Sequence, residues 1–291
     1  MDKTITSVAL GLFDGVHIGH RAVIGAACAQ RQNGLTPAVF TFQPEGVLRK
    51  SGGLSGYIYT QNEKEILLRE LIGSGTIFSP PFEELRSLTG EDFAQTVLAG
   101  QMRAAHVCCG ADFRFGRNAS CGAEELIALG RRYGFSVQIV ESVRQDGRAV
   151  SSSRIRELLL EGDVQKAGEL LGAPYFLSAR VEDGNRIGRT ISFPTINQRF
   201  CPGRLVPRYG AYATTATVEG RELPSVTNVG IKPTVGGESE PLAETHIIGY
   251  SGDLYGKTVD VAFRSFIRPE LKFSSLEELR AQIRQDIASA T

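Results

Sequence analysis

The chain has 291 residues, 42% of them hydrophobic and 22% charged, which suits a globular protein, and the length favours two domains over one. Lysine plus arginine equals aspartate plus glutamate, 32 each, so no broad surface for nucleic acid is predicted. We find no apolar stretch of membrane-spanning length, no signal peptide and no zinc-ligand spacing among the five cysteines. We therefore expect a cytoplasmic protein with free thiols and no membrane partner, whose oligomeric state the sequence does not give.

The first 140 residues alternate short apolar runs with helical periodicity. Strands are predicted at 7–12, 38–42, 76–78, 105–109 and 136–140. Helices are predicted from about 16 to 32, and at 61–72, 91–98 and 123–133. This alternation predicts a Rossmann-like α/β domain with a parallel sheet, in which ligands bind at the carboxyl ends of the strands.

The character of the chain changes after a helical stretch at 151–171, which is broken at Gly162 and stopped by Gly172-Ala173-Pro174. Short strand-like runs follow at 209–218, 223–229, 243–248 and 259–267. They predict a small antiparallel β-barrel, closed by a C-terminal helix at 275–288. We therefore predict two domains, residues 1–172 and residues 173–291.

The string GLFDGVHIGH, residues 11–20, follows the first predicted strand. If the helix begins near Val16, His17 and His20 share one face of its first turn. That turn also offers free backbone N–H groups and the positive end of the helix dipole, both of which favour phosphate. Gly11 and Gly15 would let the backbone approach the anion. We predict a nucleotide-phosphate site here; the alternative is two surface histidines or a chance metal pair.

Two later segments of the first domain also follow predicted strands. In the string GADFRFG, residues 110–116, Asp112 can accept hydrogen bonds from a ribose or base, and Phe115 can stack on a flat ring. The alternative is a loop with two aromatic rings packed inward. In SSSRIR, residues 151–156, the serines either cap the helix or hold a triphosphate, and Arg156 offers a cation to a leaving pyrophosphate.

The second domain opens on GNRIGRTISFPTIN, residues 184–197. Its glycines and arginines, Gly188 and Arg189 among them, suit a loop that covers phosphates. Thr195 and Asn197 are two apart, so in an extended segment both oxygens point the same way and can reach one Mg²⁺ ion.

Glu244 lies within a predicted strand of the barrel. A carboxylate that faces the inside of a small barrel is costly unless it has a task or a partner, which makes Glu244 a candidate base. The alternative is an outward, solvated position. Residues 252–258, GDLYGKT, are one residue short of a phosphate-binding P-loop and are predicted to form a turn.

In their order along the chain, these strings resemble the bifunctional bacterial riboflavin kinase/FMN adenylyltransferase family, also called FAD synthetase. The first-domain matches are GLFDGVHIGH, GADFRFG and SSSRIR. The second-domain matches are GRTISFPTIN, TNVGIKPT, ETH, DLYG and FIRPELKFSSLEELRAQIRQD. The resemblance implies phosphorylation of riboflavin by ATP in the barrel, then transfer of AMP from ATP to FMN in the first domain, giving FAD and pyrophosphate.

The resemblance also implies roles for residues. His17 and His20 would stabilise the α-phosphate in transfer, Ser152 and Arg156 would hold the leaving pyrophosphate, and Glu244 would take the proton from the riboflavin 5′-hydroxyl. Thr195 and Asn197 would hold Mg²⁺ with the nucleotide phosphates. The residues implied to bind nucleotide or flavin are Gly11, Phe13, Asp14, Gly15, Asp112, Phe115, Ser152, Gly188, Arg189 and Asn197.

Some residues depart from the family's usual strings. Pro44-Glu45-Gly46 stands where Pro-His-Pro is common, Ser151-Ser152-Ser153 where serine-serine-threonine is common, Ser192 where glycine is usual, and Gly249 where aspartate is usual. The first departure bears on flavin binding in the first domain. Two alternatives therefore stay open: a riboflavin kinase whose adenylyltransferase half is weak or uses another acceptor, and a flavin- or nucleotide-sensing protein without catalysis.

Overall fold

The computed structural model describes residues 4–42, 56–183, 193–233 and 239–290, and the chain forms two compact units, Met1–Ser152 and Ser153–Thr291. The helices of residues 152–171 thus fall almost entirely in the second unit. The functional boundary near residue 172 stays a prediction. Within the described residues, no helix is both long enough and apolar enough to cross a membrane.

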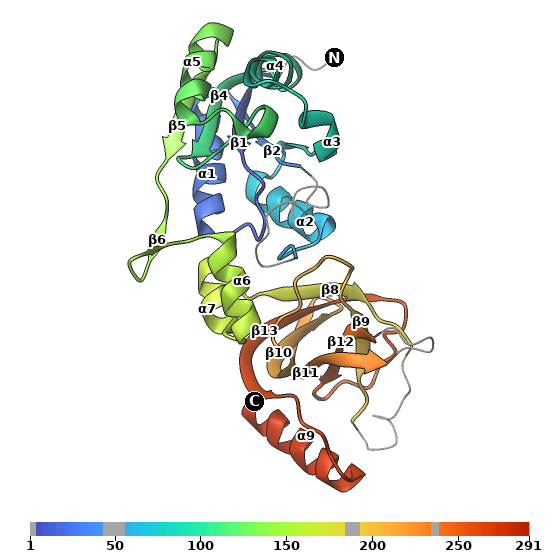
Figure 1. Ribbon diagram of the computed structural model, residues 1–291. Coiled ribbons are helices and arrows are strands. Elements are labelled where there is room, and N and C mark those ends of the chain that lie inside the picture. Colours follow the sequence, from blue (N-terminus) through green and yellow to red (C-terminus); the bar gives the residue numbers. More distant parts are fainter. Residues whose placement is uncertain (1–3, 43–55, 184–192, 234–238, 291) are drawn as a thin grey trace. The chain divides into compact units, whose positions relative to one another are not determined.

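The first unit is built on a five-stranded parallel sheet in the order β3-β2-β1-β4-β5 (Figure 1). Its strands are β1 (Thr6–Leu10), β2 (Thr36–Phe40), β3 (Thr76–Phe78), β4 (Ala104–Gly110) and β5 (Ser136–Val140). The two core clusters take alternate residues of the same strands, Val8 and Leu10 on one face and Ala9 on the other. A sheet buried on both faces is what βαβ crossovers produce, so the predicted α/β class is confirmed.

Helices connect these strands. They are α1 (Ile18–Ala29) with a 3₁₀ turn at Gln30–Asn33, α2 (Gln61–Ile72), α3 (Phe82–Leu85), α4 (Gly90–Asp92) continued by a π-helix at Phe93–Gln101, and α5 (Ala123–Tyr133). The start of α2 is fixed locally, because the Thr60 side chain accepts from the Glu63 N–H while the Glu63 carboxylate accepts from the Thr60 N–H. A two-stranded hairpin of β6 (Arg144–Gln145) and β7 (Arg148–Ala149) precedes the second unit.

The second unit is a six-stranded antiparallel sheet that curls into a nearly closed barrel, in the order β8-β13-β10-β11-β12-β9 (Figure 1). The strands are β8 (Phe176–Arg180), β9 (Ile196–Arg199), β10 (Gly210–Val218), β11 (Arg221–Pro233), β12 (Ser239–Ile247) and β13 (Thr258–Pro269). A bridge between Glu182 and Asn197 brings the two edges together. The helices are α6 (Ser152–Glu161), α7 (Val164–Leu171) and α9 (Leu276–Ala290). The predicted barrel and C-terminal helix are confirmed.

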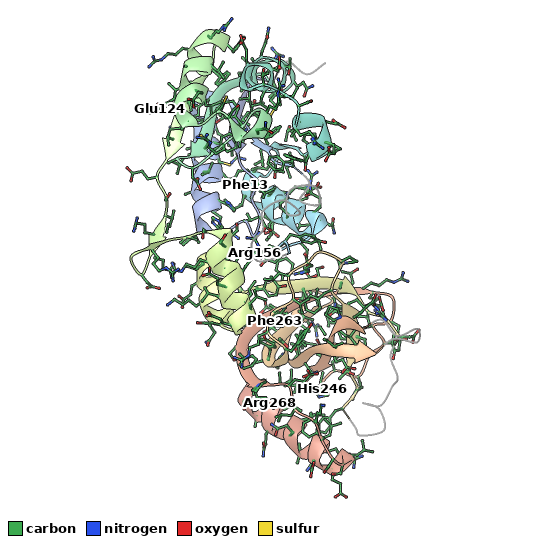
Figure 2. The ribbon with its side chains drawn as sticks, viewed as in Figure 1. Phe13, Glu124, Arg156, His246, Phe263 and Arg268 are labelled. Atoms are coloured by element: carbon green, nitrogen blue, oxygen red, sulfur yellow. The ribbon has the colours of Figure 1, made fainter. Side chains whose placement is uncertain are left out.

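The barrel interior is partly polar. Apolar side chains such as Phe263, labelled in Figure 2, fill much of it. Beside them a ladder of buried hydroxyls crosses three strands, because Thr227 Oγ1 lies 2.8 Å from the Oγ1 atoms of both Thr214 and Thr245. Each hydroxyl of the ladder satisfies its neighbour, which makes their burial tolerable and fixes the register of β10, β11 and β12.

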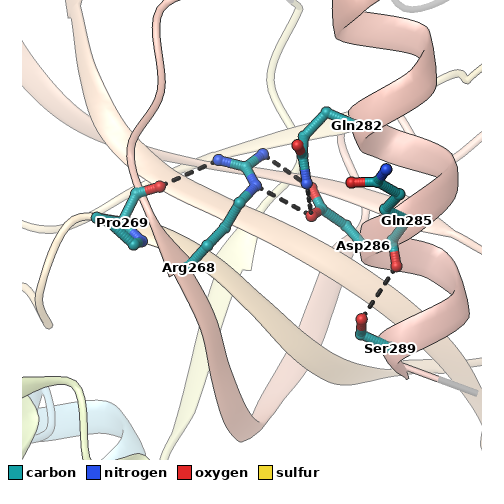
Figure 3. Close-up of polar contacts among 6 residues, drawn as sticks. All are labelled: Arg268, Pro269, Gln282, Gln285, Asp286 and Ser289. Atoms are coloured by element: carbon teal, nitrogen blue, oxygen red, sulfur yellow. Dashed lines mark hydrogen bonds and ion pairs between the residues drawn. The ribbon is translucent and has the colours of Figure 1, made fainter.

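Helix α9 packs on the outside of the barrel against β10 and β11. A buried ion pair joins it to β13: the Arg268 guanidinium donates to both Asp286 carboxylate oxygens, at 3.0 and 2.8 Å, and Gln282 donates to Oδ1 of the same carboxylate (Figure 3). Asp286 is 2% exposed. A bidentate pair with a further donor is the geometry in which a buried charge is best satisfied.

Two candidate active sites

The first candidate site is the loop between β1 and α1. His17 is the N-cap of α1, with its Nδ1 accepting from the His20 backbone N–H at 3.2 Å. The two imidazole rings stack, with centroids 3.5 Å apart and planes 16° apart, and Phe13 packs edge-on against His20. The helix therefore begins at Ile18 rather than near Val16, yet the two histidines meet as predicted. Roles for them stay predictions.

Burial controls the charge of this pair. It lowers the pKa of His17 to about 4, and burial together with the charges of His17 and Lys64 lowers the pKa of His20 well below its ordinary value. Both rings are therefore neutral at pH 7. Because Nδ1 of His17 accepts a hydrogen bond, its single proton is on Nε2, so that nitrogen is a donor. The buried Nδ1 of His20 has no hydrogen-bond partner among the residues that the structure describes.

The backbone of this loop takes left-handed conformations at Phe13, Gly15 and Val16, with φ of 54°, 85° and 44°. For a β-branched residue such as Val16 this region is unfavourable, and such strain persists only where surrounding contacts hold it. Gly11 has a different reason to be glycine, since a Cβ there would lie 2.8 Å from the Phe13 ring. The local sequence thus shapes the turn that presents the histidines.

Two polar contacts anchor the same loop. Oδ1 of the buried Asp14 accepts from the Ile58 N–H at 3.0 Å, and the Ser152 hydroxyl donates to the Asp14 carbonyl at 2.8 Å. Both residues were predicted to bind substrate. The contacts found here hold the loop, and their binding of substrate stays a prediction, as does that of Arg156, which is buried in α6.

An aromatic pocket of about 580 Å³ lies in the same unit. Its walls come from the end of β2, from α3, from the start of the π-helix and from the loop after β4. The rings that line it belong to Phe40, Phe42, Phe82, Phe93, Phe113 and Phe115. Phe113 and Phe115 stack at 5.9 Å, and Arg86, Arg114 and Arg117 stand around the pocket. Such a pocket suits a flat aromatic ring with an anionic group attached.

The two residues predicted to bind substrate in the loop after β4 therefore lie in different surroundings. Phe115 is in the pocket wall, although it also packs inward on Phe93 at 5.6 Å. Asp112 is exposed, and among the described residues the lining of the pocket includes neither Asp112 nor the two histidines. The sequence missed Phe42 and Phe82 because a phenylalanine beside a strand end looks like ordinary core until the pocket is seen.

The second candidate site lies on the outer face of the barrel. Side chains alternate along β12, and Thr245 points inward into the hydroxyl ladder, so Glu244 points outward. The expectation that Glu244 faces the barrel interior is therefore wrong, because the two-residue period assigns that face to its neighbour. Glu244 is half-buried all the same, between Asn197 of β9 and Asn228 of β11, which are its cross-strand partners.

Asn197 is a good candidate for binding a cation. It is 6% exposed, and its buried Oδ1 has no hydrogen-bond partner among the described residues. Thr195 lies one residue before β9, so the predicted face shared by Thr195 and Asn197 stays a prediction. The unsatisfied amide oxygen of Asn197 and the carboxylate of its cross-strand partner Glu244 are oxygen ligands of the kind that Mg²⁺ prefers. Within the described residues there is no cluster of three or more His, Cys, Asp or Glu that could hold a metal by itself.

A cavity of about 410 Å³ opens at Thr195, and among the described residues its lining includes neither Asn197 nor Glu244. It is lined by residues 194–196, by Thr245 and Ile247 of β12, and by the turn at residues 250–255. The turn that resembles a P-loop is thus part of a cavity wall, a role that its sequence did not reveal. Some residues discussed in the sequence analysis lie outside the described residues. They are the predicted phosphate-binding residues Gly188 and Arg189, and the departures from the family's strings at Ser192 and Pro44-Glu45-Gly46.

Comparison with known proteins agrees with this division into two sites. A family model described as FAD synthetase matches residues 1–154, and one described as riboflavin kinase matches residues 171–291. The two folds and their sites define a flavin-nucleotide transferase with an adenylyltransferase unit and a kinase barrel. The chain belongs to the bifunctional riboflavin kinase/FMN adenylyltransferase family.

Relatives with that name match almost the whole chain. The one from Pseudomonas fluorescens is 31% identical, with 97% of this chain and 90% of the relative covered. The one from Bacillus subtilis strain 168 is 34% identical, with 96% and 89% covered. A crystal structure from Streptococcus pneumoniae, titled as a macrolide-efflux protein, has a TM-score of 0.86 and 30% identity, and covers 100% of this chain and 95% of that one.

Proposed function

We propose that this protein makes FMN from riboflavin and ATP in its barrel, and then FAD and pyrophosphate from FMN and ATP in its first unit. The observation that carries the proposal is the presence of two matched units in one chain, each of which contains both a pocket and a set of candidate reactive residues. Both reactions use ATP and are in-line displacements at phosphorus, so catalysis rests on positioning and on charge stabilisation.

In adenylyl transfer, the stacked histidines act on the α-phosphate. The neutral His17 has a donor at Nε2 that is aimed by its cap on the His20 N–H. A fixed donor of this kind stabilises negative charge that grows on the α-phosphate oxygens as the FMN phosphate attacks. The aromatic pocket holds the isoalloxazine ring, with Phe113 and Phe115 among its walls. Ser152 and Arg156 are the proposed contacts of the leaving pyrophosphate.

In the kinase, Glu244 takes the proton of the riboflavin 5′-hydroxyl as that oxygen attacks the γ-phosphate of ATP and ADP leaves. Asn197, with its unsatisfied Oδ1, and Thr195 hold the Mg²⁺ that accompanies ATP. When bound, this ion supplies positive charge to the phosphate oxygens. The cavity of residues 194–196 and 250–255 receives the nucleotide. Gly188 and Arg189 belong to the proposed phosphate-covering loop.

One alternative has a specific reason behind it. Glu45 and Gly46 replace the family's usual histidine and proline, so the adenylyltransferase half would be weak or would use another acceptor. The test is to incubate the protein with riboflavin, ATP and Mg²⁺ and to follow FMN and FAD by chromatography. Formation of both products supports the proposal; FMN that accumulates without FAD supports the alternative; absence of both products contradicts the proposal.

The domain boundary and the location in the cell are part of the same proposal. We place the functional boundary near Gly172, so residues 173–291 produced alone should phosphorylate riboflavin and residues 1–172 should adenylate FMN. A piece that folds without its activity would contradict that boundary. The free thiols suit a reducing compartment, so we propose a cytoplasmic location.

A further inference from the structure

Helix α2 carries a lysine on its buried face. Lys64, Leu68 and Ile72 are spaced four residues apart and are all 2% exposed or less. Positions at this spacing share one stripe of a helix, which in α2 faces the core. A leucine or methionine would fill the position of Lys64 without the cost of burying an ammonium group, so packing alone does not account for a lysine there.

The Lys64 ammonium joins two segments of the first unit. It donates to the Leu12 carbonyl at 3.4 Å, which belongs to the loop that presents His17 and His20. It also donates to Thr41 Oγ1 at 3.2 Å and to the Phe42 carbonyl at 2.9 Å, at the end of β2. The Thr41 hydroxyl in turn donates to the Leu12 carbonyl at 2.8 Å. The Lys64 ammonium, the Thr41 hydroxyl and the Leu12 carbonyl are therefore each hydrogen-bonded to the other two.

These two segments carry different halves of the proposed reaction. The loop after Leu12 presents the histidines, and the Phe42 side chain forms part of the wall of the aromatic pocket. The Lys64 ammonium therefore fixes the distance between the groups that act on the α-phosphate and the pocket proposed for the acceptor ring. A displacement of about 1 Å between reacting groups costs roughly 100-fold in rate.

We propose that Lys64 is a positioning residue of adenylyl transfer, which ties the loop of the histidine pair to the Phe42 wall of the aromatic pocket. This inference rests on the proposed function of the first unit. The two are tested separately. FAD formation by the unaltered protein tests the proposed function, whereas the activity of Lys64 variants relative to the unaltered protein tests the inference.

The first variant is Lys64→Met, which keeps the length of the side chain and removes its three donors. We expect kcat/KM for FMN in adenylyl transfer to fall about 100-fold, with a raised KM for FMN as well as a lower kcat. Riboflavin phosphorylation by the same molecules should keep its rate. A merely structural role would lower the active fraction, which lowers kcat and leaves KM unchanged.

The conservative variant Lys64→Arg separates charge from packing. An arginine restores a cation with several donors but adds volume to a buried position, whereas methionine suits packing and lacks donors. If Lys64 positions the two segments, the arginine variant is the more active of the two in adenylyl transfer. If Lys64 only fills space, the methionine variant is the more active. Lys166→Met, the same exchange in α7, is the matched control and should leave both activities unchanged.

A third variant protects the test against misfolding at position 64. Thr41→Val removes one hydroxyl of the set and leaves Lys64 in place. We expect kcat/KM for FMN to fall about 5-fold, the size of one ordinary hydrogen bond. Quenching of FMN fluorescence on titration gives the affinity of each folded variant directly. The proposal is overturned if Lys64→Met and Thr41→Val keep the FMN affinity and the kcat of the unaltered protein, or if kinase and adenylyl transfer fall together.

Discussion

The two units position their reactive groups by different means. In the first unit the histidines stand on a loop with left-handed residues at Phe13 and Val16, and the loop is held by hydrogen bonds from distant parts of the chain. In the second unit Glu244 and Asn197 stand on paired strands, where the ladder itself fixes their separation. A loop site thus depends on individual anchors, whereas a strand site shares the stability of the whole sheet.

This difference has a consequence for mutation. Removal of one anchor of the first site, such as the contact from Ser152 to the Asp14 carbonyl, frees a strained loop to relax. Removal of one side chain in the second site leaves the strand in place, because β12 is hydrogen-bonded on both sides and the Thr227–Thr245 contact locks its inner face. Changes in the second site should therefore act on chemistry alone.

The sharpest test of the strand site is Glu244→Gln. Glutamine keeps the shape but does not accept the proton, so FMN formation should fall about 10³-fold, while FAD formation from supplied FMN continues. Chromatography of the flavins measures both. Glu240→Gln is the matched control, because Glu240 lies on the same strand and face and pairs with Arg199 at the surface. Near-normal kinase activity in Glu244→Gln would remove Glu244 from the mechanism.

The buried pair of Arg268 and Asp286 tests how far the barrel depends on α9. Asp286→Asn leaves the Arg268 guanidinium buried without its carboxylate, which costs about 3–5 kcal/mol in the free energy of unfolding. Urea unfolding of the full chain, followed through loss of kinase activity, measures this. The double variant Arg268→Met/Asp286→Leu removes both charges and should regain most of that stability. A double variant as unstable as the single one would show that the pair is not the source of the loss.

The loop site is tested by replacing His17 or His20 with alanine. Each should lower the kcat of adenylyl transfer about 100-fold and weaken ATP binding much less, because the contribution arises where charge grows in the transition state. Steady-state kinetics and ATP titration separate the two effects. His106→Ala, on β4 and half-buried beside Ser136, is the control. A loss confined to ATP affinity would contradict the proposed role.

The sequence predicts the elements better than their contacts. The bounds of α2, β3, α5 and β5 are those that periodicity predicts, because caps and glycines mark their ends. The strands β8 and β9 were not predicted, because their sequences, FLSAR and INQR, contain few apolar residues. The order of the strands in the barrel is set by pairing between strands that are distant in the sequence, and local sequence patterns do not predict it.

The candidate sites divide in the same way. The pairing of His17 with His20 follows from spacing along one turn and could be predicted. The outward position of Glu244 could not, because it depends on the register of β12 against β11. The four-residue spacing of Lys64, Leu68 and Ile72 indicates that Lys64 lies on the buried face of α2. The carbonyls to which it donates come from two other segments, which the spacing does not reveal. Contacts between distant segments are the part that sequence leaves open.

The smallest expected effect concerns pH and the loop site. Burial lowers the pKa of His17 from 6.5 to about 4, so between these values an unfolded chain binds a proton at this residue that the folded chain does not. Stability is therefore full above about pH 6.5 and is lost as the pH falls toward 4. From pH 7 to pH 6 the loss is on the order of 1 kcal/mol, seen as a lower urea midpoint.

His17→Asn isolates this contribution, because asparagine caps a helix well and does not titrate. The slope of unfolding free energy against pH between 6.5 and 4 should be shallower in this variant than in the unaltered protein. It should not vanish, because burial also lowers the pKa of His20. An equal slope in the two proteins would mean that His17 is not held neutral by burial. The donor at Nε2, on which its role at the α-phosphate rests, would then have to be assigned anew.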